Sequence, residues 1–188
     1  MIFQNLDKRD LFLVALFSGL ILILCSIYFL FIIPINPVVS NHSNLNSTII
    51  TLELIETPIE FYNLMGQVDN PKFQLYSDSF AKSIDVDNFY IFLYSFYFLL
   101  LFEIGFRYNP FINKLPFFFY LLVLFCILFD LTENYKIATL LDAKSNEQVA
   151  ESILNLRIIS LCKWFFLFLI SGFIGFLFWL ANENILLK

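Results

Sequence analysis

The chain has 188 residues, of which 60% are hydrophobic, 20% aromatic and only 14% charged. Soluble domains average about 45–50% apolar and about 25% charged residues, and a domain of this size has too much surface to bury such an apolar excess in one globular core. Eleven Lys and Arg residues against 16 Asp and Glu residues give a net charge of −5, which excludes the basic face of a nucleic-acid-binding protein. The composition therefore indicates an integral membrane protein.

Four apolar, charge-poor blocks predict four membrane helices, at about residues 11–33, 87–106, 115–142 and 158–182. A helix needs about 20 residues to cross a bilayer, and the last three blocks reach this length only when the polar residues at their ends are included. The apolar run of the first block is longer than the about 7–15 residues of a signal-peptide core, so we expect a retained helix. The predicted fold class is all-α, as a four-helix transmembrane bundle.

The one sizeable polar segment, about residues 35–86, is expected to form a short structured extramembrane cap between the first two membrane helices. Within it, Thr57-Pro58-Ile59-Glu60 is a capping box with proline at the first helical position, which predicts a short helix over 58–65 that ends at Gly66. Residues 73–83 are expected to form a second short helix that leads into the membrane helix. The whole chain, residues 1–188, is predicted to be a single integral membrane domain.

Basic residues favour one orientation of the helices in the membrane. Lys8 and Arg9 precede the first helix, Arg107 and Lys114 flank the short connection between the second and third, and the next basic residue after the first helix is Lys72. By the positive-inside rule, both termini are then cytoplasmic. The abundance of Phe, Ile, Asn and Lys hints at a bacterial source, so we expect a multi-pass protein of the bacterial inner membrane whose principal partner is the lipid bilayer.

Ionisable and polar residues fall in costly positions of the predicted helices. At 100° per residue, Asp130, Glu133 and Asn134 share one face of the third helix with Cys126 and Ile137. An up-and-down arrangement brings the start of the second helix, the end of the third and the start of the fourth to one side of the membrane. Four ionisable residues, Asp87, Asp130, Glu133 and Lys163, then lie at a similar depth, and Tyr90, Tyr94 and Asn134 are expected to form hydrogen bonds with them.

Two interpretations of this group have equal weight on the sequence alone. In the functional one, Asp130 and Glu133 are hypothetical general acid and base residues, because neighbouring buried carboxyls of which one holds a proton suit proton transfer. The residues that would bind or orient a ligand are then Asp87, Tyr90, Tyr94, Asn134 and Lys163. In the structural interpretation, the same side chains form a polar clasp that holds the helices in register near the interface.

The order of these residues resembles a group of small, uncharacterised bacterial four-helix integral membrane proteins. The resemblance rests on Leu52-Glu53-Leu54, Thr57, Asp87-x6-Tyr94, Asp130-x2-Glu133-Asn134 and Lys163, and its most specific part is the Asp-x-x-Glu-Asn motif on the third helix. It implies that these positions matter in such proteins, and it implies no reaction.

Other polar residues indicate simpler roles. The three cysteines, Cys25, Cys126 and Cys162, fall in different helices, and the one histidine, His42, lies in a polar loop, so we expect no metal site and no cofactor. Glu103 and Arg107 have the i,i+4 spacing of an ion pair. The cap acids Glu53, Glu56 and Glu60 are expected to be mostly solvated, although one of them could reach over the polar group.

Three functions are therefore compatible with the sequence. The first is an integral membrane protein that binds or acts on a lipid-like molecule by acid/base chemistry, which requires an apolar cavity of about 300–1,000 Å³ lined by the polar group. The second is a structural or accessory membrane protein whose polar group is the clasp. The third is an oligomeric proton-linked transporter. The sequence determines neither the oligomeric state nor whether the protein is an enzyme.

Overall fold

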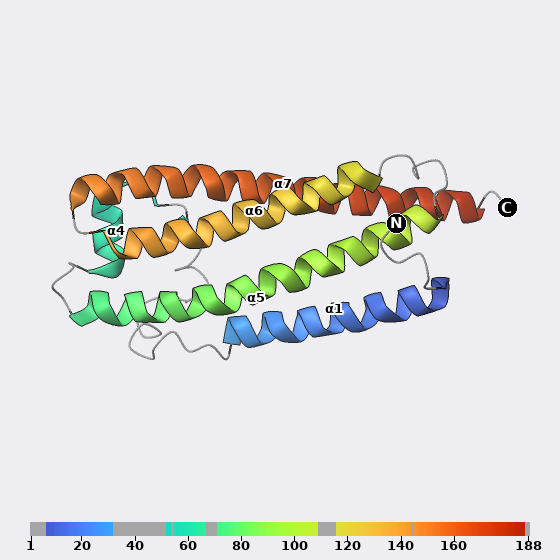
Figure 1. Cartoon of the computed structure of the whole chain (residues 1–188), viewed down its shortest axis with the longest axis horizontal. Coiled ribbons are helices and arrows are strands. Elements are labelled where there is room, and N and C mark those ends of the chain that lie inside the picture. The colour runs from blue at the N-terminus through green and yellow to red at the C-terminus, as the bar shows by residue number, and fades with distance from the viewer. Residues whose placement is uncertain are drawn as a thin grey trace. The chain divides into compact units, whose positions relative to one another are not determined.

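The computed structural model describes residues 7–31, 52–53, 55–66, 71–108, 116–143 and 145–186. Among these residues every regular element is a helix and no strand occurs, so the all-α prediction is confirmed for this part of the chain. The helices labelled in Figure 1 are α1 (Lys8–Phe31), α4 (Pro58–Met65), α5 (Pro71–Tyr108), α6 (Pro116–Leu141) and α7 (Asn146–Leu186).

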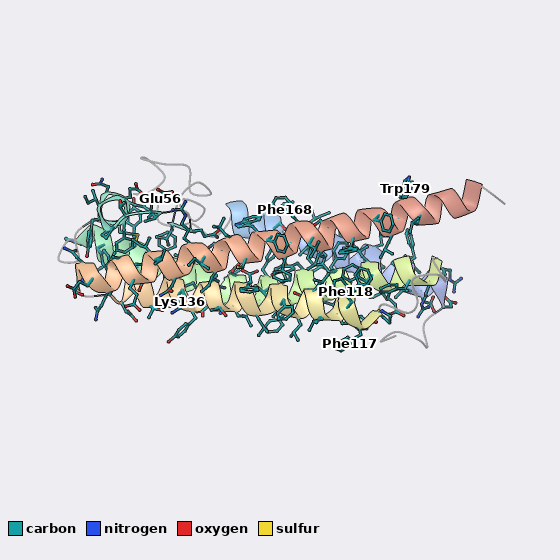
Figure 2. The ribbon with its side chains drawn as sticks, turned by 90° about the horizontal axis from the view of Figure 1, so that it is seen from above. Glu56, Phe117, Phe118, Lys136, Phe168 and Trp179 are labelled. Atoms are coloured by element: carbon teal, nitrogen blue, oxygen red, sulfur yellow. The ribbon has the colours of Figure 1, made fainter. Side chains whose placement is uncertain are left out.

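Four of these helices, α1, α5, α6 and α7, are long and apolar enough to cross a membrane. Their apolar side chains are exposed in large numbers: on α1, for example, Phe12, Leu16 and Phe17 have 59%, 59% and 63% of their surface accessible. Figure 2 shows further aromatic side chains of this kind on α6 and α7, including Phe117 and Phe168. Apolar surface of this extent is stable in lipid and not in water, so the helices fit a multi-pass membrane protein.

Two of the helices are much longer than the apolar blocks predict. At about 1.5 Å per residue, the 38 residues of α5 span about 57 Å and the 41 residues of α7 about 62 Å. The hydrocarbon core of a bilayer is only about 30 Å thick, so each helix extends well beyond it. The predicted helices 87–106 and 158–182 were therefore only the apolar parts of α5 and α7.

The additional length of both helices has a local cause. The separate helix predicted over 73–83 is wrong, because α5 is continuous and no Gly or Pro interrupts residues 72–104. Helix α7 begins at Asn146 because Ser145 caps it. The Ser145 hydroxyl accepts a hydrogen bond from the Gln148 N–H (3.2 Å), and the Ser145 carbonyl accepts one from the Val149 N–H (3.0 Å).

The chain divides into two compact units. Unit 1 comprises Met1–Cys25, Tyr90–Leu128 and Lys163–Lys188, and unit 2 comprises Ser26–Phe89 and Phe129–Cys162. Each of the long helices α5, α6 and α7 thus contributes one part to each unit. The prediction of a single integral membrane domain stays a prediction.

Unit 1 is held by close contacts between long helices. Leu11 and Ala15 of α1 are buried against Leu100 and Ile104 of α5. Aromatic rings fill the space between α5, α6 and α7, with Phe119 of α6 at 5.0 Å, centroid to centroid, from Phe102, Phe106 and Phe173. Most buried side chains of this unit are apolar, and its buried polar residues include Glu103 and Lys163.

Unit 2 has a hydrophobic core to which α4, α5, α6 and α7 all contribute, and Figure 1 shows α4 beside the start of α5, the end of α6 and the start of α7. In this core the Phe61 and Phe73 rings of α4 and α5 meet edge to face at 6.2 Å. Its buried residues are Leu52, Ile55, Phe61, Met65, Phe73, Tyr76, Phe80, Ile137, Leu140, Leu141, Ala143, Val149, Ile153 and Leu156.

The short helix of the cap forms as its capping box predicts. Thr57 is the N-cap of α4, and its hydroxyl accepts a hydrogen bond from the Glu60 N–H at 3.3 Å. The Glu60 carboxylate in turn accepts from the Glu56 N–H at 3.0 Å. The helix ends at Gly66, whose positive φ of 89° favours glycine and whose N–H donates to the Tyr62 carbonyl at 2.8 Å.

The rest of the cap differs from the expectation in one respect. Glu53, expected to be solvated, is 6% exposed, and its neighbour Leu52 belongs to the core of unit 2. Glu56 forms an ion pair with Arg157 of α7, with 2.7 Å between Oε1 and Nη2. Glu53 is buried because the segment before α4 packs into this core, whereas Glu56 and Glu60 are exposed as expected. The cap residues 35–51 lie outside the described residues.

Candidate functional site

The polar face of α6 is buried. Cys126, Asp130, Glu133, Asn134 and Ile137 are each 5% exposed or less, as expected for residues that share one face of a helix that packs against its neighbours. Two carboxyl groups and one amide are thus withdrawn from solvent within five consecutive residues. Buried polar groups are costly unless they are paired, so their contacts determine what this face does.

Asn134 joins α6 to α5. Its Nδ2 group donates one hydrogen bond to Oδ2 of Asp87 at 2.8 Å and another to Oδ1 of Asn88 at 3.0 Å. Both protons of the amide nitrogen are therefore used by two neighbouring residues of α5. Asn134 is 5% exposed, while Asp87 and Asn88 are half-buried.

Glu133 joins α6 to α7. Its carboxylate accepts a hydrogen bond from the hydroxyl of Ser160, and both side chains are almost completely buried. The same hydroxyl also lies 3.0 Å from the carbonyl oxygen of Leu156, one turn earlier on α7. A serine hydroxyl has one proton, so it can donate to only one of these two acceptors at a time.

We refer to Asp87, Asn88, Glu133, Asn134 and Ser160 as the polar cluster. All five residues belong to unit 2, and the adjacent residues Glu133 and Asn134 bond to two different helices, α7 and α5. Asp130, 5% exposed, lies one turn earlier on the same α6 face. Within the described residues, no three His, Cys, Asp or Glu side chains are placed to share a metal ion.

The other three predicted site residues belong to unit 1. The rings of Tyr90 and Tyr94 meet edge to face at 5.7 Å, and the Tyr94 hydroxyl lies 3.8 Å from the sulfur of Cys126. Lys163 is 7% exposed, and its Nζ lies 5.3 Å from the ring centroid of Trp164. The structure therefore brings Asp87 together with Asn134 in unit 2, and Tyr90 together with Tyr94 in unit 1.

Two members of the polar cluster were missed by the sequence analysis. Asn88 directly follows Asp87, and Ser160 precedes Lys163 by three residues, which is close to one helical turn. Ser160 could have been predicted from its helical spacing to Lys163, which places both residues on one side of a helix. This prediction requires that α7 already includes Ser160, and the structure shows that α7 begins at Asn146. The bonds to Asn134 and Glu133 have no local signal, because they join helices far apart in sequence.

A second buried polar group lies in unit 1. Glu103 is completely buried, its Oε1 lies 3.6 Å from Nε of Arg107, and its Oε2 accepts a hydrogen bond from the Tyr120 hydroxyl at 3.2 Å. The predicted i,i+4 ion pair is confirmed. Among the described residues, Oε1 of Glu103 has no hydrogen-bond partner, so this carboxylate is held by charge attraction on one oxygen and a hydrogen bond on the other.

The chain matches no known protein family, no curated protein and no solved structure in the comparisons made. The resemblance to small bacterial four-helix membrane proteins stays a prediction. What is established is a helical protein with four helices able to cross a membrane and a buried polar cluster in unit 2.

Proposed function

We propose that this chain is an accessory membrane protein, a four-helix transmembrane bundle in which the polar cluster acts as a clasp that holds α5, α6 and α7 in register. One observation supports this proposal above all: the side chains of two adjacent α6 residues bond to two different helices, Asn134 to α5 and Glu133 to α7. Sliding or rotating α6 against either neighbour would break at least one of these bonds.

The burial of the cluster favours a clasp over a reactive centre. Glu133 is 1% exposed and Ser160 is completely buried, so a substrate has almost no surface of either group to touch. A buried hydrogen bond also resists disruption, because separated partners would find no water in an apolar interior. Both facts are expected of groups whose task is to join helices.

Thermal unfolding in detergent tests the clasp. The variant Glu133→Gln keeps side-chain size while it removes the carboxylate that accepts the Ser160 hydrogen bond, and we expect it to lower the midpoint temperature. Complementation of a deletion strain is measured with the same variant, and it should decline in proportion to stability. If stability is retained while complementation is lost, the cluster has a task other than holding helices and the clasp proposal fails.

A second candidate function is that the protein binds or acts on a lipid-like molecule, with Asp130 and Glu133 as acid and base. The observation in its favour is that two carboxyl groups are buried on one face of α6, whereas a clasp needs only neutral amides and hydroxyls. Asp87, Tyr90, Tyr94, Asn134 and Lys163 would then bind or orient the molecule. Unit 2 has a pocket between the end of α6 and the start of α7, and α7 has a groove over Gly172. Neither Asp130 nor Glu133 lines this pocket or this groove.

Mass spectrometry of co-purified lipids distinguishes the two candidates. If the second one holds, wild-type protein retains a specific lipid that Glu133→Gln loses at unchanged thermal stability. Equal lipid content in both proteins would exclude Glu133 from a lipid site.

We further propose that the protein belongs to the bacterial cytoplasmic membrane with both termini in the cytoplasm. The support is the placement of basic residues: Lys8 and Arg9 stand before the apolar part of α1, and Arg107 lies in the last turn of α5. C-terminal fusions test this orientation. Green fluorescent protein fused there should be fluorescent and alkaline phosphatase inactive, and the reverse pattern would show an inverted topology.

A further inference from the structure

A polar pocket of about 310 Å³ lies in unit 2, between the last turns of α6 and the first turns of α7. Its volume is at the lower end of the about 300–1,000 Å³ typical of small-molecule sites. It is lined by Lys136, Thr139, Asp142 and Ala143 from the α6 side and by Gln148, Glu151, Ser152 and Asn155 from α7.

The lining carries charges of both signs. Lys136 supplies one positive charge, and Asp142 and Glu151 supply two negative charges. The remaining polar residues offer hydroxyl and amide groups, which donate hydrogen bonds readily to phosphate oxygens. A carboxylate, in contrast, requires a donor, and a primary ammonium group provides three. The pocket therefore matches a ligand that carries a phosphate and a primary ammonium together, and it matches neither a simple anion nor a simple cation.

The residues around the pocket are of the kinds that occur at a lipid–water interface. Tyr135, next to Lys136 on α6, is 65% exposed, and the Lys136 Nζ lies 6.0 Å from its ring centroid. Leu154, next to Asn155 on α7, is 61% exposed, and Ile158 one turn further is 53% exposed. An exposed aromatic ring with an adjacent lysine at the end of an apolar helix is typical of the headgroup level of a bilayer.

We propose that this pocket binds the phosphoethanolamine headgroup of a bilayer lipid. Lys136, Thr139, Ser152 and Asn155 would bind the phosphate, and Asp142 and Glu151 the ammonium. Phosphatidylcholine lacks N–H donors for the two carboxylates, and phosphatidylglycerol has no positive charge to offset them. Selectivity for a primary ammonium is therefore the signature of this site. The proposal does not depend on the clasp, because none of the lining residues belongs to the polar cluster.

Lipid titration of the detergent-purified full chain, followed by native mass spectrometry, tests the proposal. The probes are phosphatidylethanolamine, phosphatidylcholine and phosphatidylglycerol with identical acyl chains. We expect phosphatidylethanolamine to bind about tenfold more tightly than the other two, which corresponds to one charge-assisted hydrogen bond. Equal affinity for the three lipids would overturn the proposal.

Variants and a soluble competitor sharpen the test. The double variant Asp142→Asn/Glu151→Gln should lose the preference for ethanolamine, and both positions are exposed, so the fold should tolerate the changes. Glu147→Gln is the matched control, since Glu147 is an exposed acid of the first α7 turn outside the pocket lining. A preference retained in the double variant would refute the assignment. Glycerophosphoethanolamine that competes at the concentration of the lipid itself would exclude a bilayer lipid as the ligand.

Discussion

Replacing Asn134 with leucine tests the clasp at its best-defined bonds. The change keeps the side-chain size nearly constant and removes the amide that donates to Asp87 at 2.8 Å and to Asn88 at 3.0 Å. Leucine has nearly the shape of asparagine and the site is 5% exposed, so the variant should still fold with Asp87 and Asn88 left without this partner. The loss of stability then measures the two bonds between α6 and α5.

The expected loss is about 2 kcal/mol. A buried hydrogen bond contributes about 1 kcal/mol when both partners are neutral and about 1.5–3 kcal/mol when one is charged. Asp87 is only half-buried, and bonds between membrane helices average about 0.6 kcal/mol with a maximum near 1.7, so the lower part of these ranges applies. For a protein of this size, 2 kcal/mol corresponds to a decrease of about 4–8 °C in the midpoint of thermal unfolding.

The unfolding midpoint is measured in detergent from the fluorescence of the two tryptophans, Trp164 and Trp179. Gln74→Leu is the matched control, because it makes the same amide-to-leucine change at an exposed position of α5 in unit 2. A double-mutant cycle with Asp87→Ala should show coupling of at least about 0.5 kcal/mol. If Asn134→Leu is as stable as the control, or if the coupling is zero, these hydrogen bonds do not hold the helices.

Two further predictions concern unit 1. At Gly105 an added Cβ would lie 2.9 Å from Cδ1 and 3.0 Å from Cβ of Leu177, so Gly105→Ala should destabilise by about 1–3 kcal/mol. At Gly172 an added Cβ has no described heavy atom within 4 Å, so Gly172→Ala should be neutral or slightly stabilising in the same unfolding assay, and equal effects at both glycines would contradict this packing. Glu103→Gln should destabilise by about 3 kcal/mol because it removes the buried carboxylate charge that lies 3.6 Å from Nε of Arg107, and Glu103→Gln/Arg107→Met should recover most of that loss. A double variant less stable than Glu103→Gln would contradict this account.

Local chemistry predicted one part of the fold in detail. The helix α4 begins and ends where Thr57, Pro58 and Gly66 predict, because capping and a positive φ depend on a few neighbouring residues. The same kind of signal marks the start of α7, where Ser145 is followed three residues later by Gln148. The apolar blocks do not reveal this start of α7, because an apolar run locates the part of a helix that suits lipid and does not show how far the helix continues.

The candidate site was predictable only in part. Helical periodicity correctly places Asp130, Glu133 and Asn134 on one buried face of α6. It does not identify Asn88 or Ser160 as their partners, because a contact between helices depends on the rotation and axial position of each helix. Glu53 shows the same limit, since its burial depends on what the segment before α4 packs against.

By itself, the sequence determined that this protein has helices apolar enough to cross a membrane and that the polar face of α6 is buried. Transfer of apolar side chains from water to lipid is a property of each residue, so composition and periodicity suffice to predict membrane helices and the faces they bury. Only the tertiary structure decided which polar groups meet: Asn134 with Asp87, Glu133 with Ser160, and Glu56 with Arg157. These pairings depend on distances and angles between helices far apart along the chain, and such geometry follows from the packing of all side chains together.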